Sequence, residues 1–436
     1  MTAQIQAVRG MNDVLPADIG LWQRLESAAR ELLEAYGYAE MRTPVLEQTD
    51  LFKRAIGEHT DVVEKEMFTF TDQGGESLTL RPEATAGFVR AVIGNGMLRG
   101  QRHKLWCIGP MFRHEKPQKG RFRQFHQLDV EAIGFPGPDV DVELIALNAR
   151  LWRRLGITRV TLEINSLGTP ESRREYRAQL TEYLRAREGE LDADSRRRLG
   201  TNPLRILDSK NPEMQALIAA APLLPEHLDA DSRAHFAELR AALDDLGLAY
   251  RVNPRLVRGL DYYSRTVFEW VTDALGSQNA VCSGGRYDGL IAQLGGEPTP
   301  AIGFALGIER VVELMREGAS AAETAPPDVY VIAHGARASR AGLKLVEALR
   351  DALPQYRFEL GLGGGNFKAQ FRRADRSGAS LALVVGEAEL DRGTAALKPL
   401  RRESGQSDCP VAELPARIAA ALETETAATQ MEGSGG

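Results

Sequence analysis

Apolar residues recur every three or four positions in two long stretches of the chain, and this spacing predicts amphipathic helices over 18–37 and 141–155. Shorter runs of β-branched, aromatic and other apolar residues predict strands. We expect one strand over 38–46, with Pro44 at an edge or bulge, and another over 67–70. These patterns indicate a fold that contains both helices and strands.

A hairpin is predicted between residues 105 and 131. The apolar run 105–108 has the pattern of a buried strand, and the chain returns over 124–131, where Gln127, Asp129 and Glu131 share one face. The loop between the two strands is rich in positive charge, carried by Arg113, Lys116, Lys119, Arg121 and Arg123. Since cationic side chains bind phosphate, the tip of this hairpin suits a polyphosphate ligand.

The remaining chain divides into two regions of different character. Residues 170–253 are rich in Arg, Glu and Ala and carry Asn-Pro turn signals, which predicts a mainly helical segment. A small-residue and proline segment over 318–327 predicts a linker. Beyond it, alternation of strands and a helix predicts a small α/β domain, with strands at 329–333, 357–360 and 382–385 and a helix at 341–353. The polar residues 424–436 predict a disordered tail.

Composition narrows the class of protein only slightly. The chain has 436 residues, of which 43% are hydrophobic and 26% charged, as in a globular protein of two or three domains. A net charge of −6 excludes a basic protein that coats nucleic acid, although a local basic patch is compatible with it. The cysteines Cys107, Cys282 and Cys409 form no CxxC pair, which predicts a reducing, cytoplasmic setting. We expect no membrane span and no signal peptide.

Missing motifs exclude several enzyme classes. The chain contains no GxxxxGK[ST] phosphate loop, and Asn366 stands where the third glycine of a dinucleotide fingerprint would follow Gly361 and Gly363. No nucleophile elbow is present. His103 and His114 lack metal-ligand spacing, so we expect no metal ligands from the protein.

Three segments carry a resemblance to a known family. The hairpin sequence Phe112-Arg113-His114-Glu115, followed by Arg121-Phe-Arg-Gln-Phe-His-Gln127, resembles motif 2 of the class II aminoacyl-tRNA synthetases, in the form found in histidyl-tRNA synthetases. The segment Arg258-Gly-Leu-Asp-Tyr-Tyr263 is similar to an element specific to the histidyl enzymes. The segment from Gly303 to Arg310 resembles motif 3, with alanine at position 305 where many class II enzymes have glycine.

The resemblance covers nearly the whole chain and implies an α/β (α+β) fold. It implies a class II catalytic domain over 1–325, built on an antiparallel β-sheet with flanking helices and carrying a helical insertion near 170–253. It also implies an α/β anticodon-binding domain over 326–423.

The same resemblance assigns ATP-binding roles to arginines. It implies that Arg113 binds the α-phosphate, that Arg121 meets the outer phosphates, and that Arg310 stacks on adenine and holds the γ-phosphate. Arg258 resembles an additional arginine that approaches the α-phosphate and the substrate carboxylate, so Arg113 and Arg258 are predicted to be catalytic. These roles suit amino-acid activation, in which a carboxylate attacks phosphate and the protein neutralises charge; Mg²⁺ is expected with ATP.

A histidine pocket is also implied by the resemblance. Its walls are Tyr262, Tyr263 and Tyr287, and its polar contacts are Glu83, Thr85, Gln127 and Glu131. Imidazole offers a donor at one nitrogen and an acceptor at the other, so a carboxylate and a tyrosine hydroxyl can satisfy both.

The implied function is ligation of L-histidine to tRNA(His) by a cytoplasmic homodimer. Lys116 and Gln118 are expected to meet the tRNA acceptor end, and Phe367 and Lys368 to stack with and neutralise anticodon bases. The run 196–198 has two interpretations, as a solvated face or as a tRNA contact. An alternative function is a synthetase-like regulatory subunit of ATP phosphoribosyltransferase, which senses histidine without activating it.

Overall fold

The computed structural model describes residues 4–318 and 326–433, apart from residues 59, 119, 208, 210, 276–278, 403 and 404, and without the side chains beyond 424. The chain forms two compact units, Met1–Ala322 and Glu323–Gly436. The predicted linker over 318–327 lies largely outside the described residues. No described helix is long and apolar enough to cross a membrane.

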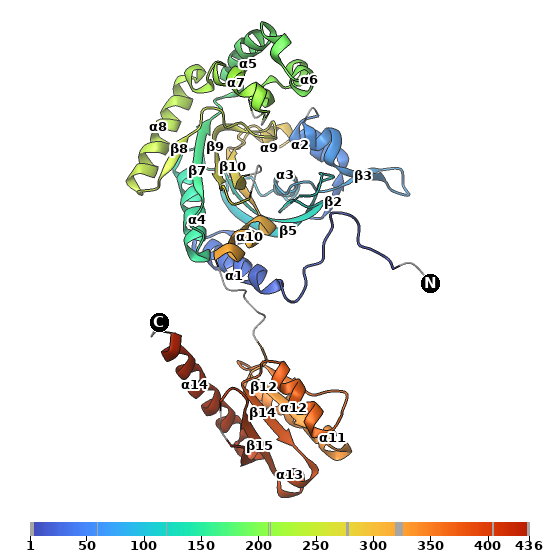
Figure 1. Ribbon diagram of the computed structural model, residues 1–436. Coiled ribbons are helices and arrows are strands. Elements are labelled where there is room, and N and C mark those ends of the chain that lie inside the picture. Colours follow the sequence, from blue (N-terminus) through green and yellow to red (C-terminus); the bar gives the residue numbers. More distant parts are fainter. Residues whose placement is uncertain are drawn as a thin grey trace. The chain divides into compact units, whose positions relative to one another are not determined.

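A large β-sheet organises the first unit (Figure 1). Its order is β1-β5-β6-β11-β10-β9-β7-β8, and the β1–β5 and β7–β8 pairs are parallel while the others are antiparallel. The strands are β1 Ala39–Glu40, β5 His103–Phe112, β6 Gln124–Ile133, β7 Thr161–Ser166, β8 Tyr250–Val252, β9 Ser264–Val271, β10 Ala280–Arg286 and β11 Ala301–Gly307. This mainly antiparallel sheet with its helices confirms the predicted fold class.

The predicted hairpin is the pair β5–β6, in register from His103 opposite Ile133 to Phe112 opposite Gln124. Its alternation places Leu128 and Val130 in a core with the helices on one face of the sheet. Gln127, Asp129 and Glu131 therefore point to the opposite face.

Helices cover the Leu128 face because each has an apolar stripe. The four that contribute to this core are α1 Ile19–Ala35, α4 Asp139–Leu155, α8 Ala230–Asp245 and α10 Ile308–Gly318. In α1, for example, Leu25, Leu32 and Leu33 are fully buried. The other face carries α2 Thr49–Ile56, α3 Thr85–Gly94 and α9 Leu290–Gln293, with a π-helical turn at Val62–Glu66.

One predicted strand is wrong. Instead of a single strand over 38–46, the chain forms β1 and then β2 Leu46–Gln48, which belongs to a separate sheet of order β2-β4-β3 with β3 Phe68–Thr71 and β4 Ser77–Leu80. Pro44 lies between the two strands and has no N–H to continue a ladder, which separates them.

The segment 170–253 is mainly helical, as expected. It contains α5 Pro170–Arg185, α6 Ala193–Thr201, α7 Gln215–Ala219 and α8, with short 3₁₀ turns between them. Thr169, Asp192 and Asp229 cap helices α5, α6 and α8 through their side chains. The end of this segment is integrated into the main core, because α8 packs against α4 and β8 extends the large sheet (Figure 1).

The second unit is an α/β fold with sheet order β13-β12-β14-β15-β16. Its strands are β12 Val329–Ala333, β13 Phe358–Leu360, β14 Leu381–Val385, β15 Thr394–Pro399 and β16 Ser407–Pro410, and its helices are α11 Ala336–Ala352, α12 Phe367–Arg376, α13 Glu387–Arg392 and α14 Leu414–Gly433. The tail predicted to be disordered from residue 424 instead continues α14 to Gly433. Its alanine, glutamate and glutamine residues have high helix propensity, which outweighs their polarity.

Candidate active site

A cavity of about 680 Å³ opens over the Gln127 face of the large sheet. It brings together predicted residues from segments far apart in the sequence, namely Glu83, Thr85, Arg113, Arg121, Gln127, Arg258, Tyr262, Tyr263, Tyr287 and Arg310. Glu131 does not line the cavity. It lies directly beneath it, 1% exposed, and contacts two residues that do.

Glu131 is held by two hydroxyl groups from different elements. Thr85, at the first position of α3, donates to Oε1 at 2.6 Å, and Tyr287 donates to Oε2 at 2.5 Å. Gly303 faces the same carboxylate across the β6–β11 pair, and a Cβ atom at this position would collide with Oε2. Glycine is therefore required here because Glu131 occupies the space of a side chain.

Glu83 lies two residues before helix α3 and accepts hydrogen bonds from the first amides of the helix. The backbone N–H groups of Thr85 and Ala86 donate to the Glu83 carboxylate at 3.0 and 2.9 Å. The hydroxyl of Tyr262 lies 3.4 Å from the same carboxylate and its ring packs on Tyr263, with centroids 4.7 Å apart. The acidic and aromatic parts of the predicted histidine pocket are thus in contact.

Burial controls the protonation of this acidic group. The pKa of Glu131 is raised to about 8, mainly by burial and also by the nearby charge of Glu83, although hydrogen bonds from Thr85 and Tyr287 lower it. Burial also raises the pKa of Glu83 and brings the pKa of Asp129 well above its usual range. The three buried carboxyl groups are therefore harder to ionise than exposed ones, and a cationic or hydrogen-donating ligand would favour their charged forms.

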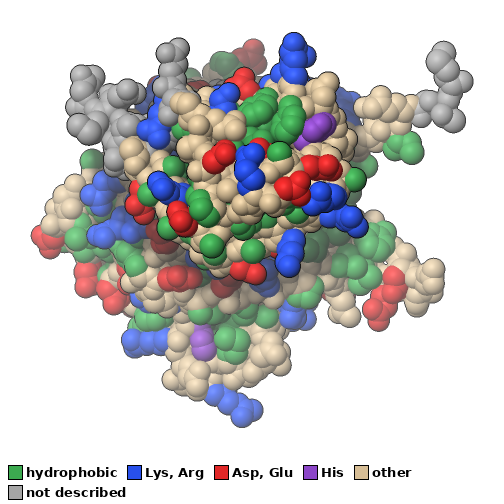
Figure 2. Space-filling view, turned by 90° about the horizontal axis from the view of Figure 1, so that it is seen from below, with side chains coloured by type: hydrophobic (Ala, Val, Ile, Leu, Met, Phe, Trp, Pro, Cys, Tyr) green, Lys and Arg blue, Asp and Glu red, His purple; other side chains and the backbone are tan. Residues whose placement is uncertain are grey.

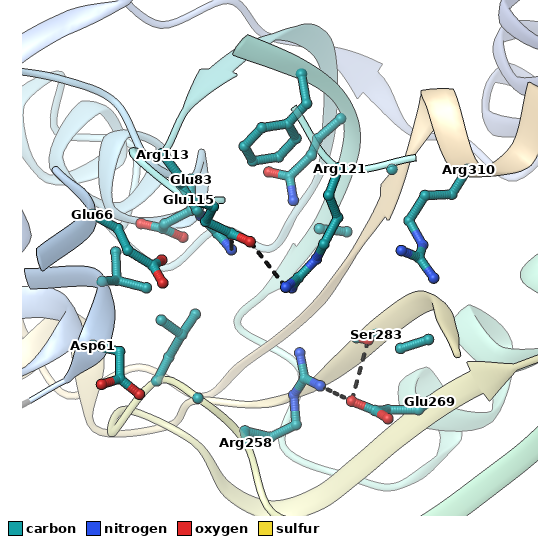
Figure 3. A pocket seen from close by; sticks show the side chains of 18 of the residues that line it. Asp61, Glu66, Glu83, Arg113, Glu115, Arg121, Arg258, Glu269, Ser283 and Arg310 are labelled. Carbon is teal, nitrogen blue, oxygen red and sulfur yellow. Dashed lines mark hydrogen bonds and ion pairs between the residues drawn. The ribbon is translucent and has the colours of Figure 1, made fainter. Parts of the chain in front are cut away.

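Arginines line the cavity from several sides: Arg113 lies beside Glu83, Arg121 and Arg310 lie across from it, and Arg258 lies beside Glu269 (Figure 3). Arg113 donates through Nε to the carbonyl of Pro82 at 2.8 Å, which fixes its direction. Glu115 lies between two arginines, 2.9 Å from Arg121 and 4.0 Å from Arg113. Burial lowers the pKa of Arg310 to about 10, with the charge of Arg121 adding to the effect, so Arg310 remains charged at neutral pH.

Arg258 lies in the segment between β8 and β9 and forms an ion pair with Glu269 on β9. Its guanidinium lies 5.4 Å from the ring centroid of Tyr263, so it stands beside the aromatic wall. Ser283 on β10 donates to Glu269 at 3.4 Å (Figure 3). The cavity thus places arginines next to the carboxylates and tyrosines, an arrangement that can hold a polyphosphate and an amino acid together.

Sequence reasoning missed several acidic residues of the site. Asp61, Glu66, Glu115 and Glu269 all line the cavity, and the arginines that pair with Asp61 and Glu269 lie in other segments. Arg198 of the insertion pairs with Asp61 at 3.2 Å, whereas its neighbour Arg197 pairs with Asp194 at 3.3 Å on the helix surface. No spacing rule connects such residues before the fold is known.

The predicted tRNA contacts lie outside the cavity. Lys116 and Gln118 are exposed, and the backbone of Gln118 pairs with that of Arg121. In the second unit Lys368 is exposed, and the half-buried Phe367 packs on His334 with ring centroids 4.5 Å apart. On the face shown in Figure 2, basic side chains are interspersed with acidic ones, so charge there does not single out a nucleic-acid surface.

In the part of the chain that the structure describes, the side chains offer few ligands for a metal ion. Among the described residues, no three His, Cys, Asp or Glu side chains gather in a metal-binding group. Glu115 and Glu269 are paired with arginines. This donor set fits an ion such as Mg²⁺ that is carried mainly by phosphates and water, with at most one or two carboxylates.

A mainly antiparallel sheet that carries a motif 2 hairpin, with a cavity lined by arginines over one face, defines a class II aminoacyl-tRNA synthetase fold. A family model described as histidyl-tRNA synthetase matches residues 10–311, and one described as an anticodon binding domain matches 328–421. The chain therefore belongs to the histidyl-tRNA synthetase family.

Solved structures agree with this assignment. Histidyl-tRNA synthetase from S. aureus is 35% identical, with 95% of this chain and all of that chain covered and a TM-score of 0.79. Two more distant structures share the fold. One is a histidyl-tRNA synthetase from Nostoc, with 18% identity and a TM-score of 0.66, and the match covers 96% of this chain and 100% of that chain. The other is a protein from Bacillus halodurans described as an ATP phosphoribosyltransferase regulatory subunit/histidyl-tRNA synthetase. It has 22% identity and a TM-score of 0.63, and the match covers 88% of this chain and 99% of that chain.

Proposed function

We propose that this protein is a histidine–tRNA ligase. It activates L-histidine with ATP, releases pyrophosphate, and transfers histidine to the 3′-terminal adenosine of tRNA(His). The observation that carries the proposal is the position of Glu131. This carboxylate is held between Thr85 and Tyr287 directly beneath a cavity lined by Arg113, Arg258 and other arginines.

Activation requires charge neutralisation rather than a protein nucleophile. The histidine carboxylate attacks the α-phosphate, an adenylate bond forms, and the bond to pyrophosphate breaks. Arg113 and Arg258 neutralise the negative charge that develops on the α-phosphate, because arginine stays protonated and donates in a fixed fork. Arg121 and Arg310 bind the outer phosphates and adenine, and Mg²⁺ bound to ATP would supply the remaining positive charge.

Specificity for histidine comes from the buried polar group at the base of the cavity. Glu131 and a tyrosine hydroxyl satisfy the two ring nitrogens, while Glu83, Thr85 and Gln127 bind the polar end of the amino acid. The side-chain oxygen of Gln127 is buried and has no hydrogen-bond partner among the described residues, so it is available for a substrate donor. An apolar amino acid would leave these groups unpaired and is rejected for that reason.

The tRNA steps follow from the division of the chain. Residues 1–325 carry out both chemical steps, with Lys116 and Gln118 near the acceptor end. Residues 326–423 read the anticodon, with Phe367 and Lys368 as the stacking and cationic contacts. The working form is a cytoplasmic homodimer, as in the family that the chain belongs to.

The decisive experiment is ATP–pyrophosphate exchange without tRNA, measured with each amino acid in turn. We expect exchange with histidine alone and its loss in Arg113→Ala. Arg153→Ala removes an exposed arginine at the end of α4 and serves as the matched control. Histidine binding without exchange would contradict the proposal. It would favour the alternative, a histidine-sensing regulatory subunit of ATP phosphoribosyltransferase.

A further inference from the structure

Glu269 is an acidic residue of the cavity that the roles given above do not use. It lies near the end of β9, opposite Ser283 in the β9–β10 register. Its carboxylate forms an ion pair with Arg258, and both side chains are only 16% exposed. The hydroxyl of Ser283 donates to the same carboxylate oxygen at 3.4 Å (Figure 3).

Arg258 depends on side-chain contacts for its orientation. Residues 253–263 form neither helix nor strand, so no regular backbone ladder fixes the base of this side chain. Glu269 pairs with one terminal nitrogen, and the ring of Tyr263 lies against the guanidinium at 5.4 Å. The Nε–H of Arg258 is buried and has no hydrogen-bond partner among the described residues. Arg258 lines the cavity, so its guanidinium is in place to contact a ligand there.

We propose that Glu269 is a positioning residue, whose carboxylate orients the guanidinium of Arg258 toward the α-phosphate and the substrate carboxylate. This inference rests on the proposed function and deepens it. Arginine has five N–H donors and the pair with Glu269 uses only part of them, so binding to Glu269 and to substrate are compatible. Glu269 remains a positioning residue because it acts through Arg258 and not on the reacting atoms.

The charge of Glu269 also suits this role better than a neutral acceptor would. Burial and the charge of Arg121 lower the pKa of Arg310, and the negative charges of Glu115 and Glu269 oppose that effect. Glu269 thus offsets repulsion between the arginines of the cavity while ATP is absent. A glutamine at this position would keep an acceptor atom but lose that compensation.

A double-mutant cycle tests the inference through kcat and KM in histidine-dependent pyrophosphate exchange. Glu269→Ala is expected to lower kcat by about 100-fold with little change in KM for histidine, since a misplacement of about 1 Å costs that much in rate. In the Arg258→Ala variant, Glu269→Ala should lower kcat no further, because the arginine that Glu269 orients is already absent. Glu163→Gln is the matched control. Glu163 stands opposite Glu269 on the neighbouring strand, is bound to Asn253 and does not line the cavity, so it should leave kcat unchanged.

Chemical rescue provides a second measurement, in which activity is gained and not lost. Low concentrations of guanidinium ion should restore exchange to Arg258→Ala in a saturable way, because Glu269 still offers its binding site. The double variant should show no rescue, with circular dichroism confirming that both proteins are folded. Losses that multiply in the cycle, or equal rescue of both variants, would overturn the role of Glu269 while leaving the proposed function intact. Absence of exchange in the wild-type protein would overturn both.

Discussion

Replacing Glu131 with glutamine should stabilise the ligand-free protein at alkaline pH. Burial raises the pKa of this carboxyl group from 4.5 to about 8. The folded state therefore holds the proton more tightly than the unfolded chain does. The stability that this proton contributes is fully present below pH 4.5 and is lost as pH rises to about 8. Glutamine has nearly the same shape and no charge, so the variant avoids this loss.

The size of the effect follows from the same pKa difference. Because one pKa unit corresponds to about 1.4 kcal/mol, ionised Glu131 costs the folded protein about 5 kcal/mol above pH 8. The wild-type and Glu131→Gln proteins should differ by less than about 1 kcal/mol at pH 5 and by nearly 5 kcal/mol at pH 9. The group is 1% exposed, so solvent screening reduces this difference little.

Urea unfolding followed by tryptophan fluorescence measures this difference. All four tryptophans, at positions 22, 106, 152 and 270, belong to the first unit, so the signal reports on the part that contains Glu131. Glu175→Gln, on the exposed face of α5, controls for the substitution itself. An equal difference in unfolding free energy at pH 5 and pH 9 would refute the reasoning. The same variant should lose about 10- to 100-fold in kcat/KM for histidine, because a hydrogen bond to a charged group contributes about 1.5–3 kcal/mol.

Three further changes test other parts of the site. Arg258→Ala should lower kcat for exchange far more than it raises KM for histidine, since Arg258 meets charge that develops in the transition state; an unchanged kcat would disprove that role. Gly303→Ala places a methyl group against Glu131, so thermal denaturation should show a loss of about 1–3 kcal/mol, and normal histidine activation in this variant would contradict the close packing. Deletion of 326–436 should spare exchange and weaken aminoacylation of tRNA, whereas equal loss of both activities would argue against a separate tRNA-binding unit.

Local sequence patterns correctly predicted the helices and strands whose formation depends on residues close to one another in the sequence. The β5–β6 hairpin follows from strand alternation around a charged loop, and α1 and α4 from their apolar spacing. The strand expected over 38–46 failed because its two halves find different partners, β5 and β4, and pairing partners are not encoded locally. The tail beyond 424 failed for the opposite reason, since local helix propensity was given too little weight.

The candidate site, like the fold, could be predicted only in part from local sequence. The arginines and tyrosines could be assigned through motifs, and the structure gathers them around one cavity. The acidic residues that pair with the arginines could not be assigned, because they lie at other places in the chain. Glu269 is 11 positions from Arg258, and Asp61 is 137 positions from Arg198. Glu131 was predicted as a contact but its depth was not, since burial depends on Gly303 from another strand.

Charge compensation explains how this cavity stays stable without its substrate. Several buried cations in one place repel each other and lose hydration, which would destabilise an empty site. Here Glu115 pairs with Arg121, Glu269 with Arg258, and Asp61 with Arg198. The phosphates of ATP carry more negative charge than these single carboxylates, so we expect them to compete with Glu115 for Arg121 and Arg113. Glu269 lies on β9 and accepts a hydrogen bond from Ser283 on the neighbouring strand, so we expect it to keep its ion pair with Arg258. We therefore expect the two carboxylates to differ in role: Glu115 yields Arg121 to the substrate, and Glu269 continues to orient Arg258.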